Sequence, residues 1–183
     1  MSDTPYFVKL EEAIEISCRT TIKTEIETVV LDESHGRILA LDLLSLVDDP
    51  AFDNSSMDGF AMRYEDTKNP PQTLDIIGTI QAAGQEDNVV VGPKQAVRIM
   101  TGAPIPEGAD SILQVELTTT NENKVTLQQE GMKHFIRKQG ENLLKGSISI
   151  TAGTILTPSR IGLCATMGHS TIPVIKPLKV AII

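Results

Sequence analysis

The sequence predicts an α+β protein in which a β-rich lobe is inserted into an elongated, discontinuous base of helices and strands. Three observations carry this prediction. Helix-like apolar spacing is found near the two ends of the chain, short strand-like segments separated by turn residues fill its middle, and neither flank holds enough apolar residues to form a core alone. We therefore expect residues 1–46 and 143–178 to pack together as the base and residues 47–142 to form the inserted lobe.

The composition excludes several classes of protein. Of 183 residues, 40% are hydrophobic and 22% are charged, as in folded globular chains. The net charge of −8 weighs against nucleic acid or an anionic membrane as partner, and the 3% of aromatic residues leaves no stacking surface for bases. Because we find neither a signal-like N-terminus nor an apolar run of about 20 residues, we predict a soluble, cytoplasmic protein.

Cysteine and histidine offer no set of metal ligands. Cys18 and Cys164 lie far apart without ligand or redox spacing, so we interpret them as reduced, half-buried thiols. His35, His134 and His169 are scattered and read as ordinary turn or surface histidines. The sequence fingerprints of common hydrolases, zinc proteases and nucleotide-binding loops are absent. We therefore predict no metal site built by this chain alone.

The N-terminal part of the base begins with a predicted helix near residues 9–21. Glutamates stand in its first turns, where the positive end of the helix dipole favours them. A β-branched strand is predicted at 25–31, a turn at 32–36 and an apolar run at 37–47. The apolar positions that recur at helical spacing and should face a core are Leu10, Ala13, Ile14, Cys18 and Ile22.

The middle of the chain reads as a small barrel or sandwich, because short apolar segments recur at near-regular spacing with turn residues between them. These segments are residues 74–80, 89–91, 96–100, 111–116, 124–128 and 134–137.

The C-terminal part of the base is predicted as a strand pair, residues 148–150 and 154–156, followed by a helix. Thr157 is suited to cap the start of this helix and Gly168 to end it, with Ile161, Cys164, Ala165 and Gly168 toward a core. Residues 179–183 resemble a buried parallel strand that opens a further domain, so the chain looks truncated.

A first candidate site lies in the polar loop and returning strand of residues 52–63. The loop can present an amide, two hydroxyls and a carboxylate together, and Gly59 permits a backbone φ that directs the acid before it. The alternative is a capped turn with solvated carboxylates, in which Asp53 is the capping acid. The polar groups are those of Asn54, Ser55, Ser56 and Asp58.

A second candidate lies in residues 100–110, where a strand enters a turn with two prolines. There Gly102 allows close backbone approach and Thr101 could offer its hydroxyl to an oxyanion, although a purely structural hairpin is the alternative. Weaker signals are Glu116, which reads as a strand-end acid, and the turn of residues 139–142, which ends on Asn142.

Taken in order, four motifs closely resemble the N-terminal half of the MoeA/gephyrin family of molybdopterin molybdenumtransferases. The resemblance runs from about residue 10 to the end of the chain, and the first two motifs are long enough to make chance agreement implausible. The motifs read F-D-N-S-S-M-D-G-F-A-M-R, R-I-M-T-G-A-P-I-P-E-G-A-D-S-I-L-Q-V-E, G-E-N-L-L-K-G and G-T-I-L-T-P-S-R-I-G-L-C-A-T-M-G.

The resemblance implies that molybdate is inserted into adenylated molybdopterin with Mg²⁺ present and AMP released. It places Asp58 and Thr101 as catalytic residues on a cleft shared with the partner subunit of a homodimer. Substrate contacts are expected from Asn54, Ser55, Ser56, Gly102, Glu116 and Asn142. Many relatives carry an aspartate where this chain has Asn142, which puts an acidic role there in doubt.

Family chains are roughly twice this length, and the segment matching residues 179–183 opens their pterin-binding domain. The isolated chain is therefore expected to be inactive, and a MogA-type molybdopterin adenylyltransferase is the expected pathway partner. Two alternatives stay open. The chain could be a non-catalytic module for dimerisation or for anchoring a partner, as in gephyrin-like proteins, or it could end at Ile183 and depend on a separate pterin-binding subunit.

Overall fold

The computed structural model describes residues 7–19, 24–82 and 89–179. Two α-helices are present in these ranges, α1 (Leu10–Arg19) and α2 (Pro158–Thr166). Short 3₁₀ helices cover Leu31–Glu33, Tyr64–Thr67, Val115–Leu117 and Lys133–Phe135. The strands are β1 (Ile26–Val30), β2 (Leu43–Leu44), β3 (Asn54–Ser55), β4 (Gly59–Met62), β5 (Gln72–Ile80), β6 (Gln95–Ile99), β7 (Ser111–Gln114), β8 (Thr118–Asn121), β9 (Lys124–Leu127), β10 (Ile136–Arg137), β11 (Ile148–Ile150) and β12 (Thr171–Ile175).

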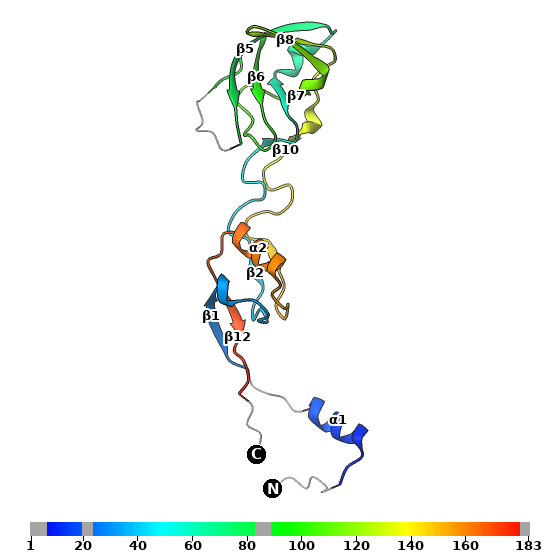
Figure 1. Ribbon diagram of the computed structural model, residues 1–183, viewed down its shortest axis with the longest axis vertical. Helices are drawn as coiled ribbons and strands as arrows, with labels where there is room; N and C mark the ends of the chain where they lie inside the picture. Colours follow the sequence, from blue (N-terminus) through cyan, green and yellow to red (C-terminus); the bar gives the residue numbers. More distant parts are fainter. Residues whose placement is uncertain (1–6, 20–23, 83–88, 180–183) are drawn as a thin grey trace.

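The molecule is elongated, with two bodies joined by two chain segments (Figure 1). We call the upper body, built on strands β4 to β9, the sheet lobe. The lower body, which holds β1, β2, β11, α2 and β12, is the base. Helix α1 lies beyond the base, at the end of the molecule opposite the sheet lobe (Figure 1).

The sheet lobe is built on a mixed six-stranded sheet with the order β7-β4-β6-β5-β9-β8. Strands β5 and β6 run parallel, and the other neighbours are antiparallel. Central strand β4 is buried along its whole length, as its run of small and apolar residues requires. Its side chains alternate between two cores, with Phe60 and Met62 in one and Ala61 in the other.

The base joins early and late parts of the chain. Strand β1 pairs with β12, and β2 pairs with β11, in both cases antiparallel. Behind these pairs lies a core that includes Leu39, Leu43, Leu156, Cys164 and Ile172, all nearly or fully buried. Strands from residues 26–44 and 148–175 thus complete each other's sheets and share one core.

Helix α2 follows its sequence signals. The Thr157 side chain accepts a hydrogen bond from the backbone N–H of Arg160, and Pro158 occupies the first turn. Cys164 faces the core as predicted, but Ala165 and Gly168 are exposed, and Met167 is the next buried residue after Cys164. The core-facing side of α2 was therefore predicted only in part.

Several predicted strands are wrong in detail. Residues 154–156 do not pair with β11, whose partner is β2; Ile155 makes only an isolated bridge to Ile38. Strands β8 and β12 were not predicted, because their threonine-rich and proline-containing sequences give no clear alternation. Of residues 89–91, only Val90 forms a bridge, to Glu107.

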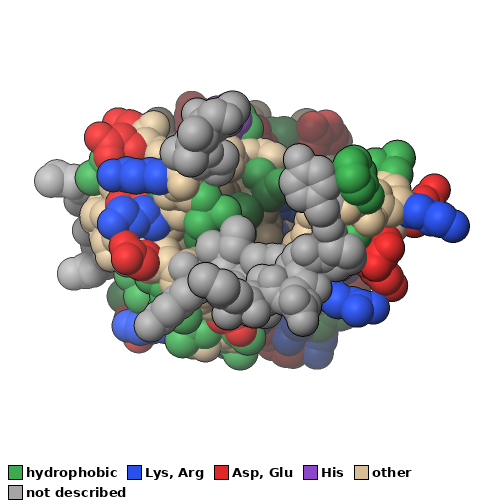
Figure 2. All heavy atoms as spheres, turned by 90° about the horizontal axis from the view of Figure 1, so that it is seen from below, with side chains coloured by type: hydrophobic (Ala, Val, Ile, Leu, Met, Phe, Trp, Pro, Cys, Tyr) green, Lys and Arg blue, Asp and Glu red, His purple; other side chains and the backbone are tan. Residues whose placement is uncertain are grey.

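Helix α1 was predicted to turn an apolar face toward a core, and it has no buried residue among those described. Leu10 is 72% exposed, Ile14 is 55% exposed, and Cys18 is exposed rather than half-buried, while Cys164 is fully buried. Figure 2, which looks at this end of the molecule, shows hydrophobic side chains at the surface beside acidic and basic ones. Ile22 and residues 180–183, which hold most of the predicted last strand, lie outside the described residues.

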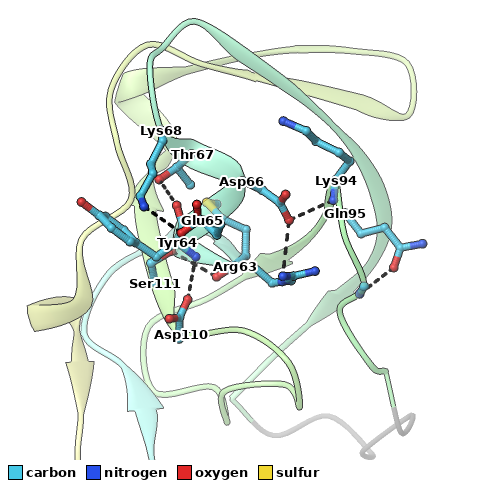
Figure 3. Close-up of polar contacts among 12 residues, drawn as sticks. Arg63, Tyr64, Glu65, Asp66, Thr67, Lys68, Lys94, Gln95, Asp110 and Ser111 are labelled. Carbon is cyan, nitrogen blue, oxygen red and sulfur yellow. Dashed lines mark hydrogen bonds and ion pairs between the residues drawn. The ribbon is translucent and has the colours of Figure 1, made fainter.

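Two aspartates fasten the connection between β4 and β5 (Figure 3). Asp110 Oδ1 accepts a hydrogen bond from the backbone N–H of Tyr64 at 2.6 Å. Asp66, which is nearly buried, accepts one from the backbone N–H of Lys94 at 2.9 Å. These bonds hold the C-terminal end of β4 in place, and the candidate site lies at its other end.

Among the described residues, no helix is long and apolar enough to cross a membrane.

Candidate functional site

Asp58 and Thr101 meet because two strands bring them together. Asp58 directly precedes β4, and Thr101 follows the end of β6. The two strands are antiparallel, with Gly59 opposite Ile99, so the start of one lies beside the end of the other. Two residues that are 43 positions apart in the chain are therefore in direct contact.

A double hydrogen bond joins the pair. Both the backbone N–H and the hydroxyl of Thr101 donate to Asp58 Oδ1, each at 2.7 Å. No described residue bonds to Asp58 Oδ2. The sequence suggests that the Thr101 hydroxyl can donate to a ligand oxyanion, and in the structure its one proton is donated to Asp58.

The backbone around the pair is held tightly. A Cβ at Gly59 would lie 2.1 Å from the carbonyl oxygen of Leu113, so only glycine lets β4 and β7 approach this closely. Gly102 has a φ of +81° and donates its N–H to the carbonyl of Ser55 at 2.7 Å. Ala103, in the same turn, is fully buried. Thr101 is therefore positioned by an anchored turn.

Hydrogen bonding keeps Asp58 ionised. The backbone N–H of Thr101, then its hydroxyl, and then the positive charge of Arg98 lower the pKa of this exposed carboxyl below its ordinary value. Asp58 is therefore a carboxylate with one fully bonded oxygen and one oxygen open to a ligand at neutral pH.

A pocket of about 320 Å³ opens at this pair. It brings together Asp58, Thr101 and Glu116, three of the residues named from the sequence. Glu116 lies in the 3₁₀ helix Val115–Leu117 rather than at the end of a strand. The pocket is also lined by Met57, Gln114 and Leu117, which sequence reasoning did not single out, although Gln114 lies within the second motif.

The other predicted substrate contacts do not line this pocket, and the two serine hydroxyls have structural partners. The Ser55 hydroxyl donates to the carbonyl of Met57, and the Ser56 hydroxyl donates to the carbonyl of Phe135. Asn54 is nearly buried in β3, opposite Arg137 in β10. Gly102 serves the turn that carries Thr101.

Asn142 also lies outside the pocket. It accepts a hydrogen bond from Arg137 at 2.9 Å and donates one to Asp49 at 2.8 Å. Asp53, expected to cap its own turn, instead accepts hydrogen bonds from Lys138 and Gln139. Both residues join the two segments that connect the sheet lobe to the base.

A second pocket, of about 230 Å³, lies elsewhere in the sheet lobe and was not predicted. Its polar lining consists of two ion pairs, Lys133 with Asp110 and Lys138 with Asp53. Because each of these charged groups is already paired, this pocket has fewer charged groups available to bind a ligand than the Asp58 pocket has. Among the described residues, no group of three or more histidine, cysteine, aspartate or glutamate side chains is arranged to hold a metal ion.

Comparison with known proteins assigns the chain to a class. The family model described as the MoeA N-terminal region, domains I and II, matches residues 8–168. The crystal structure of a molybdopterin biosynthesis MoeA protein from Pyrococcus horikoshii OT3 superimposes with a TM-score of 0.77 at 31% identity, covering 82% of this chain and 41% of that one. The chain therefore belongs to the MoeA family and corresponds to its N-terminal region.

Curated relatives are named molybdopterin molybdenumtransferases. The molybdopterin molybdenumtransferase of Bacillus subtilis (strain 168) is 39% identical over 185 residues, covering 96% of this chain and 43% of the relative. The protein of the same name from Staphylococcus aureus (strain MSSA476) is 34% identical, with the same two coverages. The chain thus spans about two fifths of the length of the curated relatives it matches.

Proposed function

We propose that this chain is the N-terminal region of an enzyme that inserts molybdate into adenylated molybdopterin and releases AMP, a step of molybdenum cofactor biosynthesis. The observation that carries the proposal is the Asp58–Thr101 pair at the mouth of a polar pocket. Both residues come from motifs that lie within the part of the chain matched by the family.

The chemistry of the pair suits a reaction among anions. Asp58 presents an oriented carboxylate oxygen, which can attract a cation or accept a proton next to a bound oxyanion. Thr101 acts as the positioning residue, since both of its donors fix Asp58 Oδ1. Met57 and Leu117 supply apolar wall on the same pocket.

Mg²⁺ fits this site in the manner usual for phosphate-transferring enzymes. It prefers oxygen ligands and is commonly bound by one or two carboxylates together with substrate phosphates, rather than by an all-protein cage. Asp58 and Glu116 are the two carboxylates that line the pocket and would hold it. Bound there, Mg²⁺ would neutralise negative charge on the substrates.

The proposal extends to the assembly. One domain is made of residues 1–46 and 143–178, which include the base and helix α1, and residues 47–142 form the inserted lobe. Two copies pair through their bases so that each Asp58 pocket faces the pterin-binding domain of the partner subunit. The described chain supplies one wall of the site and is inactive alone. A MogA-type adenylyltransferase supplies the adenylated substrate, and the dimeric enzyme acts in the cytoplasm.

The proposal is tested by AMP release. The full-length enzyme that contains this chain should release AMP from adenylated molybdopterin only when molybdate is added, and the 183-residue chain alone should release none. A full-length enzyme that shows no molybdate-dependent AMP release would refute the proposed reaction. It would favour the non-catalytic anchoring role.

A further inference from the structure

Two antiparallel chain segments join the sheet lobe to the base, residues 45–53 leading out and residues 138–147 leading back (Figure 1). Backbone hydrogen bonds tie them at the base, where the N–H of Ser45 donates to the carbonyl of Ser147 at 2.9 Å. Further along, Asp49 bonds to the backbone of Leu143 in both directions. At the lobe, β3 pairs with β10. We call these two segments the joint, and the joint is bonded through the backbone at both ends.

The joint has a gap in this backbone ladder. The last backbone bond before the lobe runs from the N–H of Gly140 to the carbonyl of Pro50 at 2.9 Å. Between that bond and the β3–β10 pair, the described residues of the two segments are joined through the side chain of Asp53. Its Oδ1 accepts from the N–H of Gln139 at 2.9 Å, and its Oδ2 accepts from Lys138 Nζ at 2.6 Å.

A second aspartate, Asp48, bonds to Gln139 from the base side of the gap. Asp48 Oδ2 accepts a hydrogen bond from the side-chain amide of Gln139 at 2.7 Å, and its Oδ1 accepts one from the backbone N–H of Lys145 at 2.7 Å. Gln139 is therefore held by two carboxylates, with its backbone N–H on Asp53 and its amide on Asp48.

We propose that Asp48 and Asp53 form a latch on Gln139 that holds the sheet lobe at a fixed angle to the base. Hydrogen bonds to an ionised carboxylate are stronger than those between neutral groups. Hinge motions concentrate in a few loop residues whose backbone is free to turn. Without the latch, the lobe swings about residues 51 and 52, which lie between Pro50, bonded to Gly140, and Asp53, whose carbonyl accepts a hydrogen bond from the N–H of Ile105 in the lobe.

The latch sets where the Asp58 pocket points, because the pocket belongs to the sheet lobe while the latch lies next to the β3–β10 pair, where the lobe meets its connecting segments. It is also reversible, since Asp53 retains 41% side-chain exposure and water can replace its partners. The latch orients two bodies within one chain, whatever reaction the pocket supports.

The test is a distribution of distances between two spin labels, one on each body. Labels at Thr120→Cys in β8 and Ser170→Cys in the base occupy exposed positions, after Cys18→Ser removes the exposed native thiol. Labelled chain is diluted with unlabelled chain so that only distances within one molecule contribute. In Asp48→Ala, Asp53→Ala and Gln139→Ala, we expect the distribution to widen by at least about twofold.

Matched controls remove aspartates that bond within one body. Asp42→Ala loses an acceptor for the N–H of Ala152 in the base, and Asp110→Ala loses one for the N–H of Tyr64 in the sheet lobe. Both should keep the native width. An unchanged width in the three latch variants would overturn the proposal, and so would equal widening in the controls.

Hydrogen exchange supplies a second reading that does not depend on labels. The backbone N–H of Gln139 is protected in the latched state, because it donates to Asp53 Oδ1. In the milder Asp48→Asn variant, its exchange should accelerate about tenfold if the latch is cooperative, although Asp53 is intact. Unchanged exchange there would show that the two aspartates act separately and would overturn the latch.

Discussion

Thr101 donates two hydrogen bonds to the same carboxylate oxygen of Asp58, one from its backbone N–H and one from its hydroxyl, each at 2.7 Å. This arrangement separates the two oxygens of Asp58 by role. Oδ1 is the anchored atom, and Oδ2 is the atom that a ligand would meet in the pocket.

The first prediction concerns the ionisation of Asp58. Thr101→Val removes the hydroxyl donor and keeps the backbone donor, so the pKa of Asp58 should rise toward its ordinary value while staying below it. Titration of the carboxyl carbon by NMR measures this shift. The control Thr118→Val, whose hydroxyl bonds to the carbonyl of Val115, should leave the titration unchanged. An Asp58 titration that does not respond to Thr101→Val would contradict the assigned contact.

The second prediction concerns the close approach of β4 and β7. Gly59→Ala places a methyl group 2.1 Å from the backbone oxygen of Leu113, which cannot move aside without breaking the sheet. We expect a loss of about 2–4 kcal/mol in the free energy of unfolding, measured by denaturant titration. Gly78→Ala in β5 is the control, since the nearest neighbour of its added methyl group, a methyl group of Val89, would lie 3.9 Å away. Equal stability of the two variants would contradict the observed strand spacing.

The third prediction is a pH dependence of stability. The pKa of Asp48 is lowered first by the N–H of Lys145 and then by Gln139, and that of Asp53 first by Lys138 and then by Gln139. Because both folded-state pKa values are lowered, their stabilisation is complete above the unfolded value of about 3.9 and is lost as the pH falls through the folded-state values.

The double variant Asp48→Asn/Asp53→Asn should therefore show a weaker fall of melting temperature between about pH 5 and pH 2 than the native chain. Thermal unfolding across that range measures it. Parallel curves for the two proteins would show that these carboxylates gain nothing from their partners in the folded state.

The fourth prediction tests the proposed pairing of two bases. Leu44 in β2 and Ile148 in β11 are opposite each other and are 46% and 51% exposed. Leu44→Asp/Ile148→Asp should weaken self-association in sedimentation experiments at tens of micromolar, a range in which typical dimers persist. Val90→Asp, at an exposed position in the sheet lobe, should not. A native protein that is monomeric under these conditions would contradict the proposed dimer of this chain.

Some local signals in the sequence predicted local structure correctly. Thr157 and Pro158 marked the start of α2, and β11 was predicted with its observed bounds. Pairings between distant segments, such as β1 with β12, could not be predicted, because they depend on register across the whole base. Amphipathic spacing in α1 predicted a helix but could not show what, if anything, covers its apolar face.

The sequence pointed to the residues of the candidate site but not to their arrangement in space. The loop of Asp58 and the turn of Thr101 were each singled out, and the register of β4 against β6 is what brings them together. The substrate contacts expected from Ser55, Ser56 and Asn142 stay predictions, and in the structure the polar groups of these residues bond within the protein. Short polar side chains in loops often bond to nearby backbone or to an adjacent segment, as these do.

The most direct test compares Asp58→Asn with Asp75→Asn in the full-length enzyme, with adenylated molybdopterin at limiting molybdate. Asp75 is an exposed aspartate paired with Lys124 outside the pocket, so its variant should keep the native rate. Asp58→Asn should lower the rate of molybdenum insertion by about 10- to 1000-fold without loss of fold, as expected when one oriented group of a reaction site is removed. Full activity of Asp58→Asn would contradict the assignment and leave Glu116 as the next carboxylate to test.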